Sequence, residues 1–385
     1  MSLIGIILGA FLLFYLQDRL YCRLWDKDLS VSLEFSGKSA VEGEECELCE
    51  RVENRKLLPI PALKVKFQVS RQLQFADEEG VSSVTDQYYR NDVLSIRPFM
   101  RHVRRLRFRC KKRGYYWING LDVVAGTIFL SGELPRSLES GARLYVYPRA
   151  HRSPEFSRTL QRLNGEILSR RHLLEDPFEF RGIREYGPQN TMREINWKAT
   201  ARTGELKVNM KNYTAEKAVR IFVNLEDGAV MRREELLEES IRMAAGAAQN
   251  FLSQGIRTAV YTNGPDIVTG ELVGMEAASA PWHMETVNRG LSRIDLSDRA
   301  PSFVWSLEET VLGQKETSRA LYTVFISSDA QEDFQELLEE CARRGMDFCW
   351  ICPVRDQDSV KIHNALEPYA QRIRIQEGET EWDGV

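Results

Sequence analysis

The feature that most restricts the fold is a change of hydrophobic pattern near the middle of the chain. Before residue 150, short apolar or alternating runs are separated by Gly, Pro and Asn. These runs cover residues 29–35, 44–52, 62–69, 104–110 and 144–147. Side chains of a strand point alternately to opposite faces, so a period of two with no helical period between the runs predicts a β-sandwich.

After residue 216 the pattern alternates between strands and helices. Runs that are typical of buried strands cover residues 217–225, 257–262, 320–327 and 347–352. Helical spacing covers residues 234–253 and 331–344, and each of these segments is followed by a glycine that can end a helix, Gly255 and Gly345. This alternation predicts a parallel sheet whose strands are joined by right-handed helical crossovers.

The length of the chain also favours two domains. With 385 residues it exceeds one ordinary hydrophobic core. We divide it into a membrane anchor helix (1–25), a β-sandwich domain (28–150), a linker (151–215) and an α/β domain (216–385). Charged residues make up 28% of the chain and the net charge is -4, which excludes general disorder and a strongly basic overall balance.

The first residues have the pattern of a membrane helix. Residues 3–16 contain no charged or strongly polar side chain, and Arg19, Arg23 and Lys27 follow them. A full span needs about 20 apolar residues, which residues 20–25 help to supply. The charge and cleavage signals of a signal peptide are missing, so we predict a retained single-pass anchor with the rest of the chain in the cytoplasm. The alternative is a buried N-terminal element of a soluble protein.

The seven cysteines are odd in number and show no framework spacing, which indicates a reducing compartment. Two pairs have the CxxC spacing, Cys46 with Cys49 and Cys349 with Cys352. Both pairs lie in predicted strands, where residues three apart point to opposite faces. We therefore expect structural thiols rather than a zinc or redox site.

Positive charge is concentrated between Arg90 and Arg113, where ten Lys or Arg face one acid, Asp92. In residues 105–111 apolar and basic side chains alternate strictly. One face of this strand is therefore apolar and the other is a row of positive charge. That row either keeps an outer face soluble or contacts anionic lipid or an acidic partner.

The predicted linker carries helix signals after Gly182, Arg184 and Tyr186. Thr191 and Glu194 form a capping box, and Gly204 can end the helix in the left-handed conformation. Arg193 and Trp197 share a face, so the guanidinium can lie along the indole. By pattern alone this is a packing helix with a solvated basic side.

This linker resembles the signature of the bacterial family named domain of unknown function 58, which is approximately G-x-R-x-Y, then G-D-x-x-R-x-I-x-W-x-x-x-A-R. The matching residues are Gly182, Arg184, Tyr186, Arg193, Ile195, Trp197, Ala201 and Arg202. Residues 41–44, 53–59 and 112–116 resemble landmarks of the same family. Gln189 and Asn190 stand where the family usually has Gly-Asp, so we expect no role that needs a carboxylate there.

The resemblance implies a membrane-associated protein with a von Willebrand factor A-like, Rossmann-type domain after an Ig-like β-sandwich. It also implies a MoxR-type AAA+ ATPase as partner, in the assembly or maturation of other proteins. We take the signature residues as candidates for partner binding. Membrane lipid is the second expected partner, through the anchor, and nucleic acid is not expected.

A von Willebrand factor A domain that binds Mg²⁺ uses D-x-S-x-S after its first strand, because the ion prefers carboxylate and hydroxyl oxygens. The matching positions here are Asn224, Glu226 and Gly228. An amide and a missing side chain make this site degenerate, although Asp227 and Asp329 leave acidity on the same sheet edge. We expect no metal or other cofactor, and we expect the edge to bind a partner without one.

Three other functions remain as alternatives: a metal-dependent adhesion module, a hydrolase with an unrecognised site and a nucleic-acid-binding protein. The five histidines belong to no recognisable Ser, Cys or metal motif. Arginines near Tyr115, Tyr116 and Trp117 are the feature that favours nucleic acid. We predict a non-catalytic scaffold or adaptor.

Overall fold

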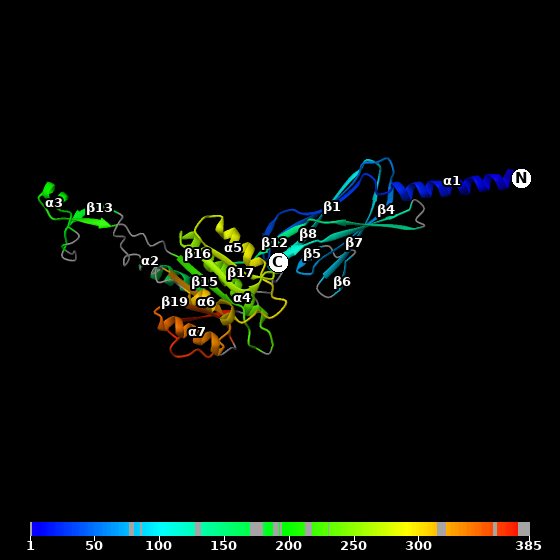
Figure 1. Ribbon diagram of the computed structural model, residues 1–385. Helices are drawn as coiled ribbons and strands as arrows, with labels where there is room; N and C mark the ends of the chain where they lie inside the picture. The colour runs from blue at the N-terminus through cyan, green and yellow to red at the C-terminus, as the bar shows by residue number, and fades with distance from the viewer. Residues whose placement is uncertain are drawn as a thin grey trace. The chain divides into compact units, whose positions relative to one another are not determined.

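The computed structural model describes residues 2–76, 81–84, 87–127, 132–169, 180–187, 192, 195–211, 218–229, 231–313, 321–356 and 360–375. The chain divides into two compact units, Met1–Arg149 and Ala150–Val385 (Figure 1). The first unit is a helix followed by β-strands, and the second is a mixed α/β unit.

The first unit begins with one long helix, and the remaining elements are strands. In chain order they are α1 (Ser2–Leu24), β1 (Leu29–Phe35), β2 (Ser39–Val41), β3 (Glu45–Asn54), β4 (Ile60–Ser70), β5 (Leu73–Phe75), β6 (Val81–Val84), β7 (Gln87–Ile96), β8 (Arg101–Cys110), β9 (Gly114–Trp117), β10 (Gly120–Gly126), β11 (Glu133–Glu139) and β12 (Arg143–Tyr147). Helix α1 is long and apolar enough to cross a membrane.

Two antiparallel sheets of this unit enclose one core. Their strand orders are β1-β3-β8-β5 and β11-β10-β4-β7-β6, and a smaller sheet has the order β2-β12-β9. Leu48 and Leu106 of the first sheet share a buried cluster with Val65 and Phe67 of the second. The predicted β-sandwich is therefore confirmed.

Strand β8 has the alternation that its sequence predicts. Leu106 and Phe108 are buried, whereas Arg105 and Arg107 are exposed. Arg107 pairs with Glu47 on β3 at 3.3 Å, so part of the basic row is neutralised within its own sheet.

The last turn of α1 belongs to the sandwich core rather than to a free tail. Tyr21 and Trp25 are 1% and 5% exposed, and the Tyr21 hydroxyl donates to the carbonyl of Gly126 at 3.2 Å. The Lys56 ammonium donates to the carbonyls of Trp25 and Lys27. A cation at these orphan carbonyls also stabilises the negative end of the helix dipole.

The second unit alternates helices and strands. In chain order they are α2 (Pro154–Ser169), β13 (Phe180–Glu185), α3 (Trp197–Thr203), β14 (Lys207–Lys211), β15 (Ala218–Asn224), α4 (Glu234–Ser253), β16 (Arg257–Pro265), β17 (Leu272–Ala278), α5 (His283–Ser292), α6 (Phe303–Leu312), β18 (Leu321–Ser327), α7 (Glu332–Arg343), β19 (Phe348–Arg355) and β20 (Ala370–Ile375). The predicted strands and helices of residues 217–352 are confirmed within one to three residues.

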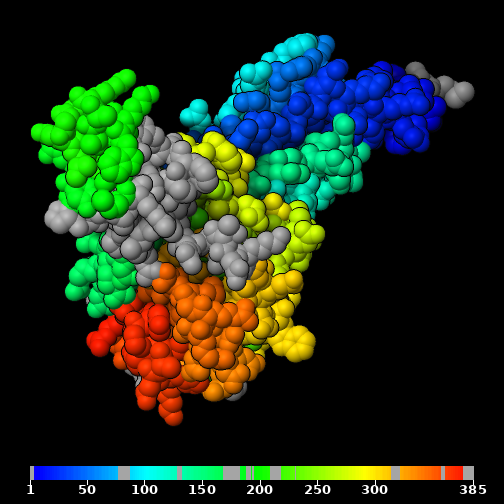
Figure 2. All heavy atoms as spheres, turned by 60° about the vertical axis from the view of Figure 1, so that its left-hand side comes forward, coloured from blue at the N-terminus to red at the C-terminus, as the bar shows by residue number. Residues whose placement is uncertain are grey.

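A six-stranded sheet with the order β17-β16-β15-β18-β19-β20 forms the centre of this unit. All neighbours are parallel except β16 and β17. Helices α2, α4 and α5 bury their apolar side chains on one face, and α6 and α7 on the other. The outer side of α7 forms part of the orange surface in Figure 2.

Strand β19 separates one of the CxxC pairs, as its spacing predicts. Cys349 packs in the core on the α4 face, and Cys352 packs in the core on the α7 face. The two thiols therefore point away from each other across the sheet, and they cannot ligate one metal ion.

The predicted linker, residues 151–215, differs from the observed structure at its beginning. Helix α2 places Phe156, Leu160, Leu163 and Ile167 in the core of the α/β unit. These residues recur every three or four positions and so form one apolar stripe, which folding buries against the sheet. Residues 154–169 are thus part of the α/β unit.

We expect Lys56→Met to destabilise the first unit by about 1–3 kcal/mol, because two carbonyls at the end of α1 lose a charged donor. The midpoint of thermal unfolding of the detergent-solubilised chain measures this change. Lys66→Met, at an exposed lysine of β4, is the matched control and should leave the midpoint nearly unchanged. Equal midpoints for the two variants would show that Lys56 does not hold the helix.

Candidate functional site

The central sheet has a topological switch point between β15 and β18. Helix α4, which follows β15, covers one face of the sheet, and α7, which follows β18, covers the other. The two chain directions therefore diverge at the carboxyl ends of these strands, where Asn224 pairs with Ser327. Doubly wound sheets bind ligands in the crevice outside such a point.

Asn224 organises the loop that follows β15. Its Oδ1 accepts hydrogen bonds from the backbone N–H of Glu226 at 2.8 Å and from Nδ2 of Asn263 at 3.3 Å. Asn263, near the end of β16, also accepts from the N–H of Leu225 and donates to the carbonyl of Pro301. The side chains of Asn224 and Asn263 thus join three segments of the chain, namely the loop after β15, the end of β16 and the segment at Pro301. The Asn224 Oδ1 atom already accepts two hydrogen bonds.

The two carboxylates after Asn224 are also used inside the unit. Glu226 accepts the backbone N–H of Phe303 at 2.9 Å, at the start of α6. Asp227 accepts the backbone N–H of Arg233 at 2.6 Å and the Arg233 guanidinium at 3.0 Å. Burial opposes ionisation of Asp227, but these bonds, together with one from the N–H of Ala229, hold its pKa below the usual value.

Asp329, after β18, has the opposite electrostatic environment. It is 3% exposed, and burial together with the negative charge of Glu226 raises its pKa to about 6. The backbone N–H groups of Gly228 and Gln331 oppose this shift. Asp329 is therefore a carboxyl group whose charge changes just below neutral pH.

Gly228, the third position of the degenerate metal motif, lies under another side chain. A Cβ added there would meet Nε2 of Gln331 at 2.0 Å. Within the described residues, no group of three or more His, Cys, Asp or Glu is arranged to hold a metal ion. Asn224 and Glu226 are thus engaged in internal hydrogen bonds and Gly228 is covered by the Gln331 amide, whereas Oδ2 of Asp329 has no hydrogen-bond partner in the part of the chain that the structure describes.

Two large apolar side chains are exposed on segments that border this edge. Met231 is 84% exposed in the loop after β15, and Trp305 is 90% exposed on α6. The Glu226 bond to Phe303 and a bond from Arg299 to the carbonyl of Ala229 join the two segments. An exposed tryptophan beside a rigid loop is typical of an interface anchor.

Met231 and Trp305 were not identified from the sequence as candidate interface residues, although the helical pattern around Trp305 gives one signal. Phe303, Leu307 and Val311 define the buried stripe of α6 at intervals of four residues. Trp305 lies two residues from the stripe and thus on another face of the helix. The sequence signal for Trp305 is therefore a large aromatic residue on the solvent face of a short helix.

The signature residues form a small strand-helix-strand module. Strand β13 carries Gly182 and Arg184 and pairs antiparallel with β14, and the N–H of Tyr186 donates to the carbonyl of Leu206 at 2.9 Å. Ile195 and Val208 are buried and form an antiparallel β-bridge with each other.

Helix α3 of this module begins later than predicted. Its N-cap is Asn196, whose Oδ1 accepts the N–H of Ala199 at 3.0 Å, and Gly204 ends it with φ of 76° as predicted. An amide side chain one residue before the first helical turn thus takes the capping role. The predicted capping box, Thr191 with Glu194, lies outside the described residues, as do Arg193, Gln189 and Asn190.

The outer face of α3 is exposed. Trp197 is 64% exposed, and Ala201 and Arg202 are also exposed. Arg184 on β13 is exposed as well. The module thus presents an indole and two guanidinium groups to solvent, which suits the predicted partner binding.

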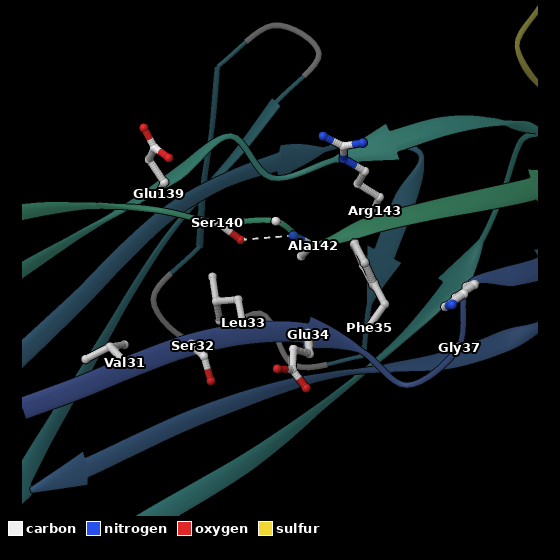
Figure 3. Close-up of a pocket in the computed structure, with 12 residues that line it drawn as sticks. Val31, Ser32, Leu33, Glu34, Phe35, Gly37, Glu139, Ser140, Ala142 and Arg143 are labelled. Carbon is white, nitrogen blue, oxygen red and sulfur yellow. Dashed lines mark hydrogen bonds between the residues drawn. The ribbon is translucent and has the colours of Figure 1, made fainter.

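A groove of about 400 Å³ opens along the edge strand β1 of the first unit (Figure 3). Val31, Leu33 and Phe35 line one wall, and residues 139–143 line the other. The Ser140 hydroxyl accepts a hydrogen bond from the N–H of Ala142 at 3.3 Å, so these two polar groups of the second wall are paired with each other. The groove brings no cluster of catalytic side chains together and is the weaker candidate site.

No model of a protein family matches the sequence, and no curated protein matches it. Among solved structures, the chain is similar to a CARDB domain from Pyrococcus furiosus (13% identity, 31% of this chain, 94% of that chain, TM-score 0.19). A non-cellulosomal cohesin from Archaeoglobus fulgidus shares 10% identity over 30% of this chain and 91% of its own, with a TM-score of 0.20. A human PapD-like domain shares 15% identity over 31% and 87%, with a TM-score of 0.20. Similarity at this level carries no argument about function.

We expect Asp329→Asn to stabilise the chain at pH 7.5 by roughly 1–3 kcal/mol and to have little effect near pH 4. The folded pKa lies above the ordinary value, so the native carboxyl gives stability that is present at low pH and is lost as pH rises to about 6. Asparagine does not ionise, so the variant does not lose this stability as pH rises. Thermal unfolding at both pH values measures the effect, and an equal shift at both would contradict it.

Magnesium serves as the control in the same assay. An ion that binds only the folded chain raises the unfolding midpoint by mass action. We expect millimolar Mg²⁺ to leave the midpoints of wild type and Asp329→Asn unchanged. A stabilisation of the wild type alone would mean that the acidic edge still binds a cation.

Proposed function

We propose that this chain is a membrane-anchored, non-catalytic scaffold that binds protein partners through the carboxyl edge of its α/β sheet. A MoxR-type AAA+ ATPase is the partner that the signature residues favour, and the complex would assist the assembly or maturation of other proteins. The proposal includes no cofactor, no metal and no nucleic acid.

One observation carries this proposal. The switch point, where doubly wound domains bind ligands, holds carboxylates that are already hydrogen bonded, while Met231 and Trp305 beside it are exposed. A site whose Glu226 and Asp227 carboxylates are hydrogen bonded internally and whose rim is apolar suits a protein surface better than a small polar ligand.

The architecture supports a von Willebrand factor A-like assignment for the second unit and an Ig-like assignment for the sandwich. The sheet is doubly wound with one antiparallel edge strand, and the loop after its first strand holds the degenerate motif positions Asn224, Glu226 and Gly228. For α1, basic residues after the apolar run favour a single pass through the cell membrane with the bulk of the chain in the cytoplasm.

We expect Trp305→Ala to weaken binding of a MoxR-type ATPase roughly tenfold or more, as loss of a central aromatic anchor does. Trp282→Ala is the matched control, because Trp282 is 65% exposed but precedes α5, whose His283 binds the carbonyl of Thr258 at the opposite end of β16. Affinity is measured by pull-down and titration with the solubilised chain. Equal losses in the two variants would argue against an interface at the carboxyl edge.

The signature module is tested separately. We expect Trp197→Ala combined with Arg202→Ala to weaken pull-down of the same ATPase and to leave the far-UV circular dichroism unchanged, because both side chains are exposed. Ile195→Ala is the contrast, since Ile195 is 6% exposed and supports the module. Unfolding of the double variant would instead make the signature a structural clasp.

A further inference from the structure

Two turns of the first unit lie at the base of α1. They join β3 to β4 (residues 55–59) and β7 to β8 (residues 97–100). The N–H of Phe99 donates to the carbonyl of Lys56 at 3.2 Å, and the N–H of Asn54 donates to the carbonyl of Met100 at 2.9 Å. Asn54 Nδ2 donates to carbonyls in both turns, so the two turns form one rigid tip.

The same tip is bonded to the end of the membrane helix. Lys56 donates to the carbonyls of Trp25 and Lys27, and the N–H of Arg55 donates to the carbonyl of Asp28 at 2.9 Å. In Figure 1, α1 extends outward from the end of the sandwich where β4 lies. The tip is therefore held next to the point where the helix leaves the domain.

The depth of this point in a bilayer follows from helix geometry. At about 1.5 Å per residue, the 21 residues of the candidate span Ile4–Leu24 cover the roughly 30 Å of a hydrocarbon core. The charged Asp18, Arg19 and Arg23 of its last two turns mark where the headgroup layer begins. The buried Tyr21 and Trp25 then lie at the boundary between hydrocarbon and headgroups. Residues bonded to positions 25–28 are at the same level, within reach of the headgroup layer.

The tip exposes apolar side chains that the sandwich core does not use. Leu57 is 77% exposed, Phe99 is 69% exposed and Met100 is 44% exposed. Three such residues therefore lie on two turns that are hydrogen bonded to each other, and soluble surfaces rarely keep exposed apolar side chains grouped in this way without a use. Phe99 also has a positive φ of 52°, which is unfavourable for a bulky residue and is typical of functional positions.

Positive charge surrounds this patch. Residues 26–28, 53–59 and 97–101 contain five basic side chains, Lys27, Arg55, Lys56, Arg97 and Arg101, against three acids, Asp26, Asp28 and Glu53. Glu53 accepts hydrogen bonds from Arg55 and Arg101, both at 3.1 Å, and leaves the tip with a net positive charge. Apolar tips within a basic rim match a membrane surface that contains anionic lipids.

We propose that the turns at residues 55–59 and 97–100 insert Leu57 and Phe99 into the headgroup layer of the membrane that α1 crosses. This inference rests on the membrane anchor of the proposed function. The bilayer, rather than a protein, is the occupant, because the patch lies at the level of the interface and carries the charge that anionic lipid attracts. Helix and tip together then hold the sandwich at a fixed tilt, which one helix alone does not do.

The test places an environment-sensitive fluorophore on single cysteines in the full chain, reconstituted into vesicles of phosphatidylcholine and phosphatidylserine with brominated acyl chains. The background replaces Cys22, Cys46 and Cys49, the cysteines that are not fully buried, with serine. Leu57→Cys and Phe99→Cys are the test positions. Val41→Cys, 42% exposed in β2 beyond the far end of β1, is the control, and Leu12→Cys reports insertion of α1.

We expect bromine to quench the labels at positions 57 and 99 about twofold or more over position 41, as insertion of roughly 5–10 Å requires. Quenching at position 12 with none at 57 and 99 would overturn the inference and leave the anchor intact. No quenching at position 12 would remove the anchor and the inference together. A blue-shifted emission at 57 and 99 without bromine quenching would assign the patch to contact with a second copy of the chain rather than with lipid, and would also overturn the inference.

Discussion

The α/β unit depends on the complete burial of its central strand, β15. Ile221 and Phe222 are both 0% exposed and point to opposite faces, so helices must cover both sides of the sheet. A parallel sheet meets this requirement through crossovers on alternate faces. The divergence at Asn224 and Ser327 is a direct consequence of that arrangement. The crevice at the carboxyl edge therefore exists because of core packing, whatever side chains line it.

What the crevice does is decided by where its polar groups are satisfied. Asn224, Glu226 and Asp227 each accept a backbone N–H from the same unit, and Gln331 covers Gly228. Side-chain oxygens that accept hydrogen bonds from the protein hold the loop rigid, whereas oxygens directed toward solvent would be able to bind a cation. Met231 and Trp305 are then carried on a backbone that these hydrogen bonds hold, so that the backbone has little conformational entropy left to lose on binding.

In the first unit, the end of helix α1 likewise needs its polar groups to be hydrogen bonded. The carbonyls at the end of α1 need donors, and Lys56 supplies them, while Tyr21 and Trp25 enter the core. The apolar helix is thereby continuous with the sandwich, without a flexible connection. This continuity explains why the exposed tip at Leu57 and Phe99 has a defined distance from the helix. A membrane anchor joined to its domain in this way can set orientation as well as location.

Hydrophobic period alone determined the classes of both units and most strand and helix positions of residues 217–352, because local periodicity reflects which face is buried. It also determined the alternation on β8 and the separation of Cys349 from Cys352, and a glycine at position 204, which can adopt the left-handed conformation, determined the end of α3. Tertiary structure decided that α2 joins the α/β core, that Asn196 caps α3 and that Gln331 covers Gly228. It also brought Met231 and Trp305 to one edge. These contacts join residues far apart in the chain, or single side chains whose rotamers no pattern encodes, so only packing in three dimensions could specify them.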